Sequence, residues 1–298
     1  MTIGILDGQT IQALIFAKQL KGAGHKVLLF CSEKLSYGYM TRYVSKKIIC
    51  PSSKKNTNTY HNFILDYLKD NVIDVLIPMN DDSAKYLSSN KTVLLKHANF
   101  SIPDLDVFMK GYDKNQLMQV CNKNNFPHPK TIDLEKNITL TNNSNFKFPA
   151  LIKPNEASGA RGFTMVNNLE EVQKVYPSLK KKYGKCHLQQ FIPSGGRQFK
   201  VQILINNQEL LSSTVIEKKR FYPIKGGSSC FNKTIENDSL VNLCFNVLNT
   251  IQWEGFADFD LIEDPRDGNI LIMEINPRVP ACIKASIVSV QAFPTAII

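Results

Sequence analysis

Two apolar segments near the carboxyl end, residues 255–263 and 270–275, place the strongest constraint on the fold. They flank the turn sequence Asp-Pro-Arg-Asp-Gly at 264–268, so we predict two antiparallel strands that pair side by side. Hydrophobic residues make up 43% of the 298 residues, which is enough to bury a sizeable core around such a pair.

Polar residues recur at alternate positions in these two segments. Asp258 and Asp260 lie two apart and share a face of the first strand, and Glu274 and Asn276 share a face of the second. Oxygen donors that converge in this way suit a magnesium ion, which also takes oxygen ligands from phosphates. The alternative is a solvent-exposed hairpin with acidic side chains; the apolar residues that flank Glu274 favour a buried strand and therefore the metal.

The first hundred residues alternate predicted strands and helices. We expect strands at 3–6, 27–30, 47–50 and 72–77, and helices at 10–20 and 60–69. This β-α-β-β-α-β order predicts a parallel sheet covered by helices. The sequence Asn-Asp-Asp-Ser at 80–83 follows a buried strand and is interpreted as a helix cap, with the lining of a substrate cleft as the alternative.

The pattern changes after Asp113. We expect helices at 115–122, from 169 and at 239–251, a polar loop at 139–147, and strands at 150–153, 163–166, 187–191, 199–205 and 210–216. A helix cap is expected at Asn167 or Asn168, and a hairpin turn at 206–209. The second part is therefore predicted to be α+β, with mostly antiparallel strands.

A second chemical feature is the segment 148–163, Phe-Pro-Ala-Leu-Ile-Lys-Pro-Asn-Glu-Ala-Ser-Gly-Ala-Arg-Gly-Phe. A strand ends near Lys153, and a loop of small residues leads into the next strand. Such a loop lets backbone N–H groups approach phosphate oxygens, while the lysine adds a positive charge. The alternative is an ordinary hairpin with a glycine turn.

Together these features resemble the ATP-grasp superfamily, in its carbamoyl-phosphate-synthetase-like and carboxylate–amine ligase branch. Four motifs match in order. They are Tyr-Asp-Lys at 112–114 followed by Pro-His-Pro at 127–129, the strand and loop at 148–163, Leu-Gln-Gln-Phe-Ile-Pro at 188–193, and the strand pair at 255–278 that ends in Glu-Ile-Asn-Pro-Arg.

The resemblance implies an α/β domain that precedes an α+β, two-lobed ATP-grasp domain. The expected boundaries are 1–100 for a Rossmann-like pre-ATP-grasp domain and 101–298 for the ATP-grasp domain. Its small lid lobe would span about 113–190 and its large lobe about 191–298.

The resemblance also implies roles for particular residues. Catalytic roles fall on Arg278, Arg220 and Lys153. Nucleotide-binding roles fall on Lys114, Lys153, Ser158, Gly159, Ala160, Arg161, Gly162, Gln190, Ile192 and Gln198. The segment Lys-Gly-Gly-Ser at 225–228 resembles one that closes over the γ-phosphate, and the metal ligands would be Asp260, Glu274 and Asn276.

The expected activity is an ATP-dependent ligase that uses Mg²⁺ or Mn²⁺. A carboxylate would attack the γ-phosphoryl group to form an acyl phosphate, and an amine would then displace phosphate. A bicarbonate-using or carbamoyl-phosphate-forming enzyme is the alternative. Two departures concern the nucleotide: Gln190 and Gln198 stand where the family commonly has acids.

Charge and cysteine content limit the remaining classes. The formal net charge of +10 suits anionic ligands, and it leaves a nucleic-acid-binding protein or a regulator without turnover as rivals. The basic residues are dispersed and no recognition motif appears, so we expect no nucleic-acid partner. Seven scattered cysteines without a C-x-x-C pair, no signal peptide and no apolar run long enough for a bilayer predict a cytoplasmic protein without a membrane partner, and the family resemblance is compatible with a homodimer.

Overall fold

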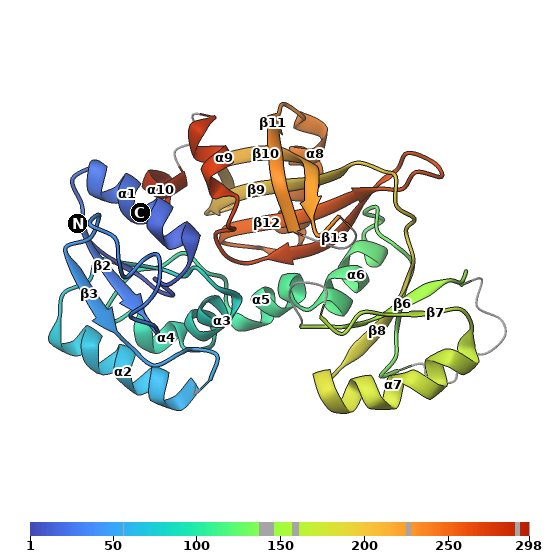
Figure 1. Cartoon of the computed structure of the whole chain (residues 1–298), viewed down its shortest axis with the longest axis horizontal. Coiled ribbons are helices and arrows are strands. Elements are labelled where there is room, and N and C mark those ends of the chain that lie inside the picture. Colours follow the sequence, from blue (N-terminus) through green and yellow to red (C-terminus); the bar gives the residue numbers. More distant parts are fainter. Residues whose placement is uncertain (56, 137–145, 157–160, 225–227, 290–292, 298) are drawn as a thin grey trace.

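The computed structural model describes residues 1–55, 57–136, 146–156, 161–224, 228–289 and 293–297. Its strands form one parallel sheet and two antiparallel sheets, and helices pack on or between them (Figure 1). Among the described residues, every helix is too short or too polar to span a bilayer. The expectation of both parallel α/β and antiparallel α+β structure is confirmed.

The parallel sheet is built from the first eighty residues. Its order is β3-β2-β1-β4, with β1 (Thr2–Ile5), β2 (Lys26–Cys31), β3 (Lys46–Ile49) and β4 (Val75–Ile77). The predicted helices are α1 (Ile11–Gly22), whose amino end is capped by the Thr10 hydroxyl, and α2 (Thr57–Asp70). The last strand begins three residues later than predicted, because Val72 is 82% exposed and lies outside the sheet.

Three helices follow that sheet: α3 (Asp81–Ser89), α4 (Lys91–Leu94) and α5 (Leu105–Tyr112). The predicted helix start at residues 80–83 is confirmed, although the Asn80 side chain makes no capping hydrogen bond. For α3 the sequence predicted only this start, and α4 and α5 were not predicted, since their apolar residues are interrupted by polar ones. In the chain they are followed by α6 (Lys114–Lys123), and α5 and α6 both pack on a strand of the largest sheet.

The smallest sheet is antiparallel, with order β5-β8-β6-β7. Its strands are β5 (Thr131–Asp133), β6 (Ala150–Pro154), β7 (Thr164–Val166) and β8 (Cys186–Gln190). One face is covered by α7 (Leu169–Tyr183), and of the two predicted caps it is Asn168 that accepts the Glu171 N–H. Strand β5 was not predicted, and the predicted loop at 139–147 lies outside the described residues except at its end.

The largest sheet has the order β11-β10-β9-β12-β13. Its strands are β9 (Gln198–Asn206), β10 (Glu209–Tyr222), β11 (Ser228–Ile235), β12 (Gly255–Glu263) and β13 (Ile270–Asn276). The predicted turn joins β9 to β10, with positive φ at Asn207 and Gln208. Strand β10 runs to Tyr222, six residues beyond its predicted end at Ile216, because it continues to pair with the unpredicted β11.

The two faces of this largest sheet differ in chemistry. On one face Phe199, Val201 and Phe259 are buried in an apolar core with α8 (Asp238–Ile251), and Trp253 and Ala257 join the same core. The opposite face carries the alternate residues of β9, β12 and β13, which are polar over half their length. One face of the sheet therefore packs in the apolar core, and the other face carries residues of the candidate site.

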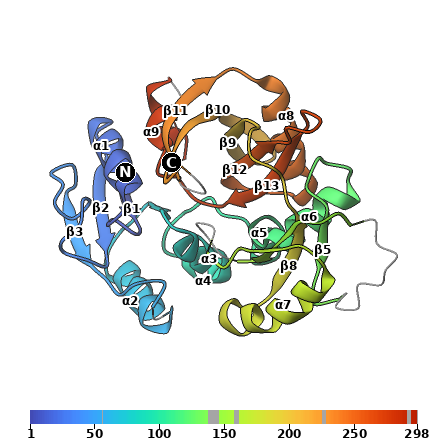
Figure 2. The same ribbon diagram turned by 45° about the vertical axis from the view of Figure 1, so that its right-hand side comes forward.

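The three sheets surround the central helices (Figures 1 and 2). In both views α5 and α6 run beneath the largest sheet, with the parallel sheet on one side and the smallest sheet on the other. The last helices, α9 (Ile283–Val288) and α10 (Phe293–Ala296), pack against α1. The predicted domain and lobe boundaries stay predictions.

Candidate active site

Two predicted phosphate-binding lysines lie where the smallest sheet meets the central helices. Lys114 is the first residue of α6, and Asp113 caps that helix by accepting the Gln116 N–H at 3.0 Å. The Lys114 ammonium lies 3.1 Å from Glu274. Lys153 is buried in β6, where its ammonium donates to the Gln189 side chain. Burial lowers the pKa of Lys153 to about 8, Glu274 opposes that fall, and Lys114 adds to it.

A buried chain of hydrogen bonds supports these lysines from behind. The Asn155 amide donates to the Asp113 carboxylate at 3.3 Å, and its oxygen lies 2.9 Å from His187 Nδ1. Because an amide oxygen only accepts, Nδ1 carries the proton. Burial lowers the pKa of His187, and the nearby Lys153 and Lys114 lower it further, so the imidazole is neutral. Apart from the loop motif, no pattern in the sequence predicts this network of hydrogen bonds.

The residues predicted to contact the nucleoside part of ATP fall at the end of the smallest sheet and the start of the largest. Gln190 ends β8 and is partly buried, Ile192 is buried, and Gln198 begins β9. The neighbouring Gln189, which was not predicted, is the glutamine that contacts Lys153.

The predicted phosphate lid is described only at its carboxyl end. Ser158, Gly159 and Ala160 lie outside the described residues, as do residues 225–227 of the second closing segment. Arg161 is exposed. Gly162 has a positive φ of 78°, and a Cβ atom there would come within 2.9 Å of Pro154 and Tyr183, so the backbone at this position requires glycine.

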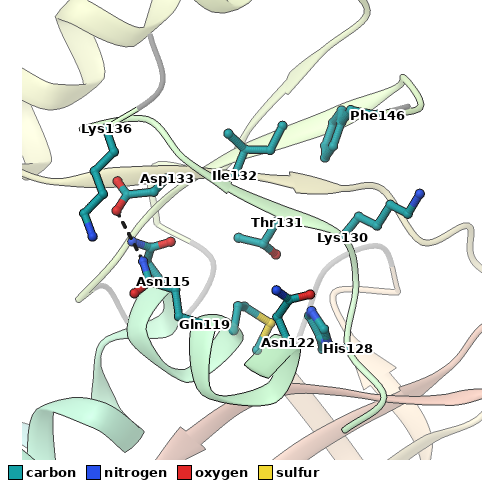
Figure 3. A pocket seen from close by; sticks show the side chains of 11 residues that line it. Asn115, Gln119, Asn122, His128, Lys130, Thr131, Ile132, Asp133, Lys136 and Phe146 are labelled. Atoms are coloured by element: carbon teal, nitrogen blue, oxygen red, sulfur yellow. Dashed lines mark hydrogen bonds between the residues drawn. The ribbon is translucent and has the colours of Figure 1, made fainter. Parts of the chain in front are cut away.

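A pocket of about 640 Å³ opens beside α6 and β5 (Figure 3). Asn115, Gln119 and His128 line it together with Lys130 and Asp133, and Gln119 donates to Asp133 at 3.3 Å. No residue predicted for the nucleotide or metal site is among its lining residues. His128 Nδ1 lies 2.8 Å from the Phe126 carbonyl.

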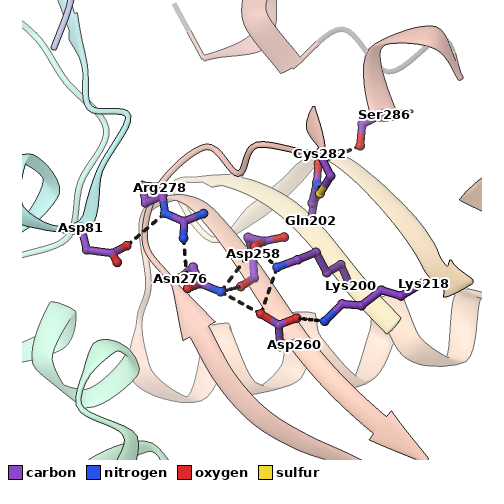
Figure 4. Close-up of polar contacts among 10 residues, drawn as sticks. All are labelled: Asp81, Lys200, Gln202, Lys218, Asp258, Asp260, Asn276, Arg278, Cys282 and Ser286. Atoms are coloured by element: carbon purple, nitrogen blue, oxygen red, sulfur yellow. Dashed lines mark hydrogen bonds and ion pairs between the residues drawn. The ribbon is translucent and has the colours of Figure 1, made fainter. Parts of the chain in front are cut away.

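The predicted metal residues lie on the polar face of the largest sheet, where Figure 4 shows Asp260 and Asn276 side by side. The antiparallel register places Asp260 opposite Glu274 and Asp258 opposite Asn276. The Asn276 amide donates to Asp260 Oδ2 at 3.0 Å and to the Asp258 carbonyl at 3.2 Å. The structure therefore brings together the three predicted metal residues and the neighbouring Asp258.

Two lysines that were not predicted as site residues contact these acids. Lys200 donates to Asp258 at 2.6 Å and to Asp260 at 2.9 Å, and Lys218 donates to the other Asp260 oxygen (Figure 4). Burial alone would raise the pKa of Asp260, but the two ammonium groups hold it well below its ordinary range. The signal for Lys200 was its position between the apolar Phe199 and Val201, which turns it to the polar face of its strand.

The two predicted arginines lie in different surroundings. Arg278 donates to Asp81 at 3.1 Å and to Asn276 at 3.4 Å, so it joins the first turn of α3 to the acid cluster. The cleft that residues 80–83 would line stays a prediction. Arg220 is exposed, and its guanidinium lies 5.5 Å from the centre of the Phe231 ring. At β10 it is Lys218, two residues before Arg220, that reaches the acids.

The predicted metal residues have the ligand type that magnesium prefers. All three offer oxygen atoms, and the sheet register sets Asp260 and Glu274 directly opposite each other. Asp258 adds a buried carboxylate oxygen without a hydrogen-bond partner. Among the described residues, no group of three His, Cys, Asp or Glu side chains is arranged to hold a metal, so the protein would share the ion with phosphate oxygens and water.

Comparison with known proteins defines the family. A model of the ATP-grasp domain matches residues 112–282, which is more than half of the chain, and the chain belongs to the ATP-grasp family. It is 22% identical to a D-aspartate ligase from Enterococcus faecium over 302 residues, covering 93% of this chain and 71% of that protein.

Solved structures of carboxylases share the fold. The biotin carboxylase domain of the Hydrogenobacter thermophilus 2-oxoglutarate carboxylase, in complex with MgADP and bicarbonate, matches with a TM-score of 0.78 and 16% identity, covering 99% of this chain and 68% of that one. Rhizobium etli pyruvate carboxylase matches with a TM-score of 0.75 and 11% identity. This match covers 97% of the present chain but only 27% of the pyruvate carboxylase.

These comparisons confirm the family predicted from the four motifs. The family match is in accord with the predicted ATP-dependent ligase, and the MgADP bound in the 2-oxoglutarate carboxylase domain is in accord with the predicted ATP and Mg²⁺. The individual roles of the site residues stay predictions.

Proposed function

We propose that this chain is a carboxylate–amine ligase that activates its carboxylate substrate as an acyl phosphate. The observation that carries the proposal is the convergence of Lys114, Glu274, Asp260, Asn276 and Arg278. Lys114 on α6 lies 3.1 Å from Glu274, and Asn276 joins Asp260 to Arg278 through contacts of 3.0 and 3.4 Å. The register of β12 and β13 sets Asp260 opposite Glu274 and so brings the two groups together. Such a site combines cations for a triphosphate with oxygen donors for magnesium.

The nucleotide would enter between the smallest and the largest sheet. Lys114 and Lys153 supply the positive charge for its phosphate oxygens, and Gln190 and Ile192 lie at the strand end proposed for adenine. Lys153 suits this role because its present partner is a neutral amide, which a phosphate oxygen can replace with a gain in charge pairing. Magnesium, held at Glu274 and Asn276 with Asp260 beside them, would neutralise charge on the transferred phosphoryl group.

The carboxylate would bind beside Arg278. A carboxylate oxygen attacks the γ-phosphorus of ATP, ADP leaves, and an acyl phosphate results. The amine then attacks the acyl carbon, and phosphate leaves as the C–N bond forms. The Arg278 guanidinium faces the site and can stabilise the negative oxygen of the tetrahedral state. None of these steps needs a serine, cysteine or histidine nucleophile.

The D-aspartate ligase likeness supports an amino acid as the carboxylate substrate. Asp81 lies just beyond β4 of the parallel sheet, at the carboxyl edge where ligands bind in many α/β proteins. It is held by Arg278, so this edge opens toward the nucleotide site. We propose that one of the two small-molecule substrates is bound between Arg278 and this edge.

The remaining predictions belong to the same proposal. The chain would divide near residue 100 into a pre-ATP-grasp domain and an ATP-grasp domain, and the second would divide near residue 190 into a small and a large lobe. It would act in the cytoplasm on small molecules, alone or as a homodimer.

The test is ADP release from Mg–ATP with panels of D- and L-amino acids, offered singly and with amine acceptors. We expect release to depend on one acid–amine pair and to be lost in Glu274→Ala. Lys174→Ala, on the exposed face of α7, serves as the matched control with full activity. Release that needs only bicarbonate would instead support the carboxylating alternative. A chain that binds Mg–ATP but consumes it with no acid–amine pair would contradict the ligase proposal.

A further inference from the structure

Lys200 occupies an unusual place in the acid cluster. It lies on β9 directly opposite Asp260 on β12, and its ammonium group bridges Asp258 Oδ2 at 2.6 Å and Asp260 Oδ2 at 2.9 Å (Figure 4). The Lys200 side chain is only 13% exposed, and Asp258 is fully buried. The sheet register fixes this contact, because all three side chains rise from paired positions on the same face.

The two oxygens of Asp260 are both engaged by cations. Lys218, from β10, donates to Oδ1, while Lys200 and the Asn276 amide donate to Oδ2. A magnesium ion binds a carboxylate oxygen at about 2.1 Å and carries two positive charges. It cannot share Oδ2 with an ammonium group at 2.9 Å without strong repulsion between the two cations.

Glu274 differs from its partner across the strand pair. Its side chain is 28% exposed, and its Oε2 atom lies 3.1 Å from the Lys114 ammonium group. Lys114 rises from the amino end of α6, a separate element that is not paired with the sheet. A cation can therefore reach Glu274 from the nucleotide side, whereas Asp260 is enclosed by the neighbouring strands.

We propose that Lys200 is a built-in cation that takes the place of a second metal ion, so that the site holds a single divalent cation with each nucleotide, on Glu274 and Asn276. Asp260 and Asp258 then serve to position Lys200. This inference rests on the proposed function, since it concerns the metal that accompanies ATP at that site.

The charges of the cluster agree with this arrangement. Three carboxylates, those of Asp258, Asp260 and Glu274, meet the three ammonium groups of Lys114, Lys200 and Lys218. The acids are therefore already neutralised by lysines of the chain, and a cation that is to bind at Asp258 and Asp260 must displace the Lys200 ammonium group.

The test counts divalent ions instead of measuring activity. The whole chain is titrated with Mn²⁺ in the presence of a non-hydrolysable imido analogue of ATP, and bound Mn²⁺ is counted by electron paramagnetic resonance. We expect about one Mn²⁺ per bound nucleotide in the wild type. In Lys200→Gln the two carboxylate oxygens that Lys200 held are free to bind one cation together. We therefore expect about two Mn²⁺ ions per nucleotide, with spectra broadened by Mn–Mn coupling.

Two further variants test whether the number of bound Mn²⁺ ions depends on a positive charge at position 200. Lys200→Arg keeps a positive charge between the carboxylates and should retain about one ion. Lys219→Gln removes an exposed lysine from the same sheet, one residue from Lys218, and should also retain about one.

Every outcome of the Mn²⁺ count either supports or overturns the inference about Lys200. About two ions per nucleotide in the wild type, or about one in a folded Lys200→Gln, would overturn the inference and leave the ligase proposal standing. A wild-type chain that binds no Mn–nucleotide complex would overturn both. If Lys200→Gln does not fold, the counts for the wild type and for Lys200→Arg still decide, because two ions in either one contradict a resident cation.

Discussion

Two buried lysines on two different sheets show how the same side chain can serve opposite purposes. Lys200 on the largest sheet lies between the carboxylates of Asp258 and Asp260. Lys153 on the smallest sheet donates to the neutral Gln189 and lies 4.7 Å from the centre of the Phe163 ring. Both are buried, but only the first has a full negative charge beside its ammonium group.

The pKa values of the two lysines move in opposite directions for this reason. Burial lowers the pKa of Lys200, yet the two aspartates outweigh burial and raise it above its ordinary value. Burial lowers the pKa of Lys153 to about 8, and the opposing effect of Glu274 is smaller. We infer that Lys200 is neutralised within the protein, while Lys153 is held ready for an anion that comes from outside.

The largest expected effect is on stability when Lys200 is removed. Lys200→Met leaves Asp258 and Asp260 buried without their shared cation, and breaking a buried pair costs roughly 3 kcal/mol or more of the free energy of unfolding. Urea unfolding monitored by circular dichroism measures the change. The double variant Lys200→Met with Asp258→Asn should recover a substantial part of the loss, and equal stabilities for the single variant and the wild type would show that the pair is not formed.

The same substitution at Lys153 should act in the opposite direction. Lys153→Met removes a charge buried beside a neutral partner, so we expect the empty protein to gain about 2 kcal/mol of stability at pH 7. ATP should bind roughly 10- to 100-fold more weakly, because a charge-assisted hydrogen bond to phosphate is lost. Urea unfolding and isothermal titration with ATP analogues measure the two effects, and Lys174→Met on α7 is the control. A variant that loses stability and keeps its ATP affinity would break the contrast between the two lysines.

The stability gain of Lys153→Met should also depend on pH. Between the folded pKa of about 8 and the ordinary value of 10.5, the unfolded chain binds more protons at this lysine than the folded chain does. The wild type therefore becomes more stable relative to the variant as the pH rises through this window. The difference in free energy of unfolding should be largest below pH 8 and should shrink by about 1.4 kcal/mol per pH unit above it. A difference that stays constant from pH 7 to pH 10 would mean that Lys153 is not the titrating group.

The site around Lys153 could be predicted well from the sequence, and the contacts of Lys200 could not. The motifs around Lys114 and Lys153, and the acids of the strand pair, can be recognised locally because each lies in a short segment of characteristic order. Lys200 and Lys218 lie on two further strands, and only the register of β9, β10 and β12 brings them to Asp260. Such pairings depend on which strands become neighbours, which residue periodicity along one strand does not specify.

The fold shows the same division between local and non-local information. The strands and helices of the parallel sheet could be predicted because their apolar residues form short runs with clear breaks. Helix α3 could be predicted only at its start and α5 not at all, since α3 packs on α5 and α5 packs on β13, which are contacts between distant segments. Strand β11 was missed because it is an edge strand whose pairing with β10 is set by the register of distant residues and not by a local apolar pattern.

A smaller effect is expected at the contact between Asp81 and Arg278. Both side chains are largely buried, and the pair joins α3 to the acid cluster. Asp81→Asn keeps the shape but removes the charge that holds the guanidinium, so we expect kcat/KM for the carboxylate substrate to fall about tenfold, or roughly 1.4 kcal/mol. Asp106→Asn, which changes an exposed carboxylate on α5, is the matched control. If both variants behave like the wild type, the orientation of Arg278 does not depend on Asp81.

The smallest effect on stability is expected at an exposed ion pair. This pair joins a lysine to a carboxylate, as the Lys200 pairs do, but it is not buried. Lys85 on α3 pairs with Glu156 after β6, and the two side chains are 38% and 42% exposed. Exposed pairs contribute less than about 1 kcal/mol, because water and salt screen the attraction. Lys85→Met should therefore change the free energy of unfolding by about 0.5 kcal/mol, and 0.5 M salt should remove most of that change. A loss as large as that of Lys200→Met would mean that burial does not separate the two kinds of pair, and the explanation given for the cluster would have to be abandoned.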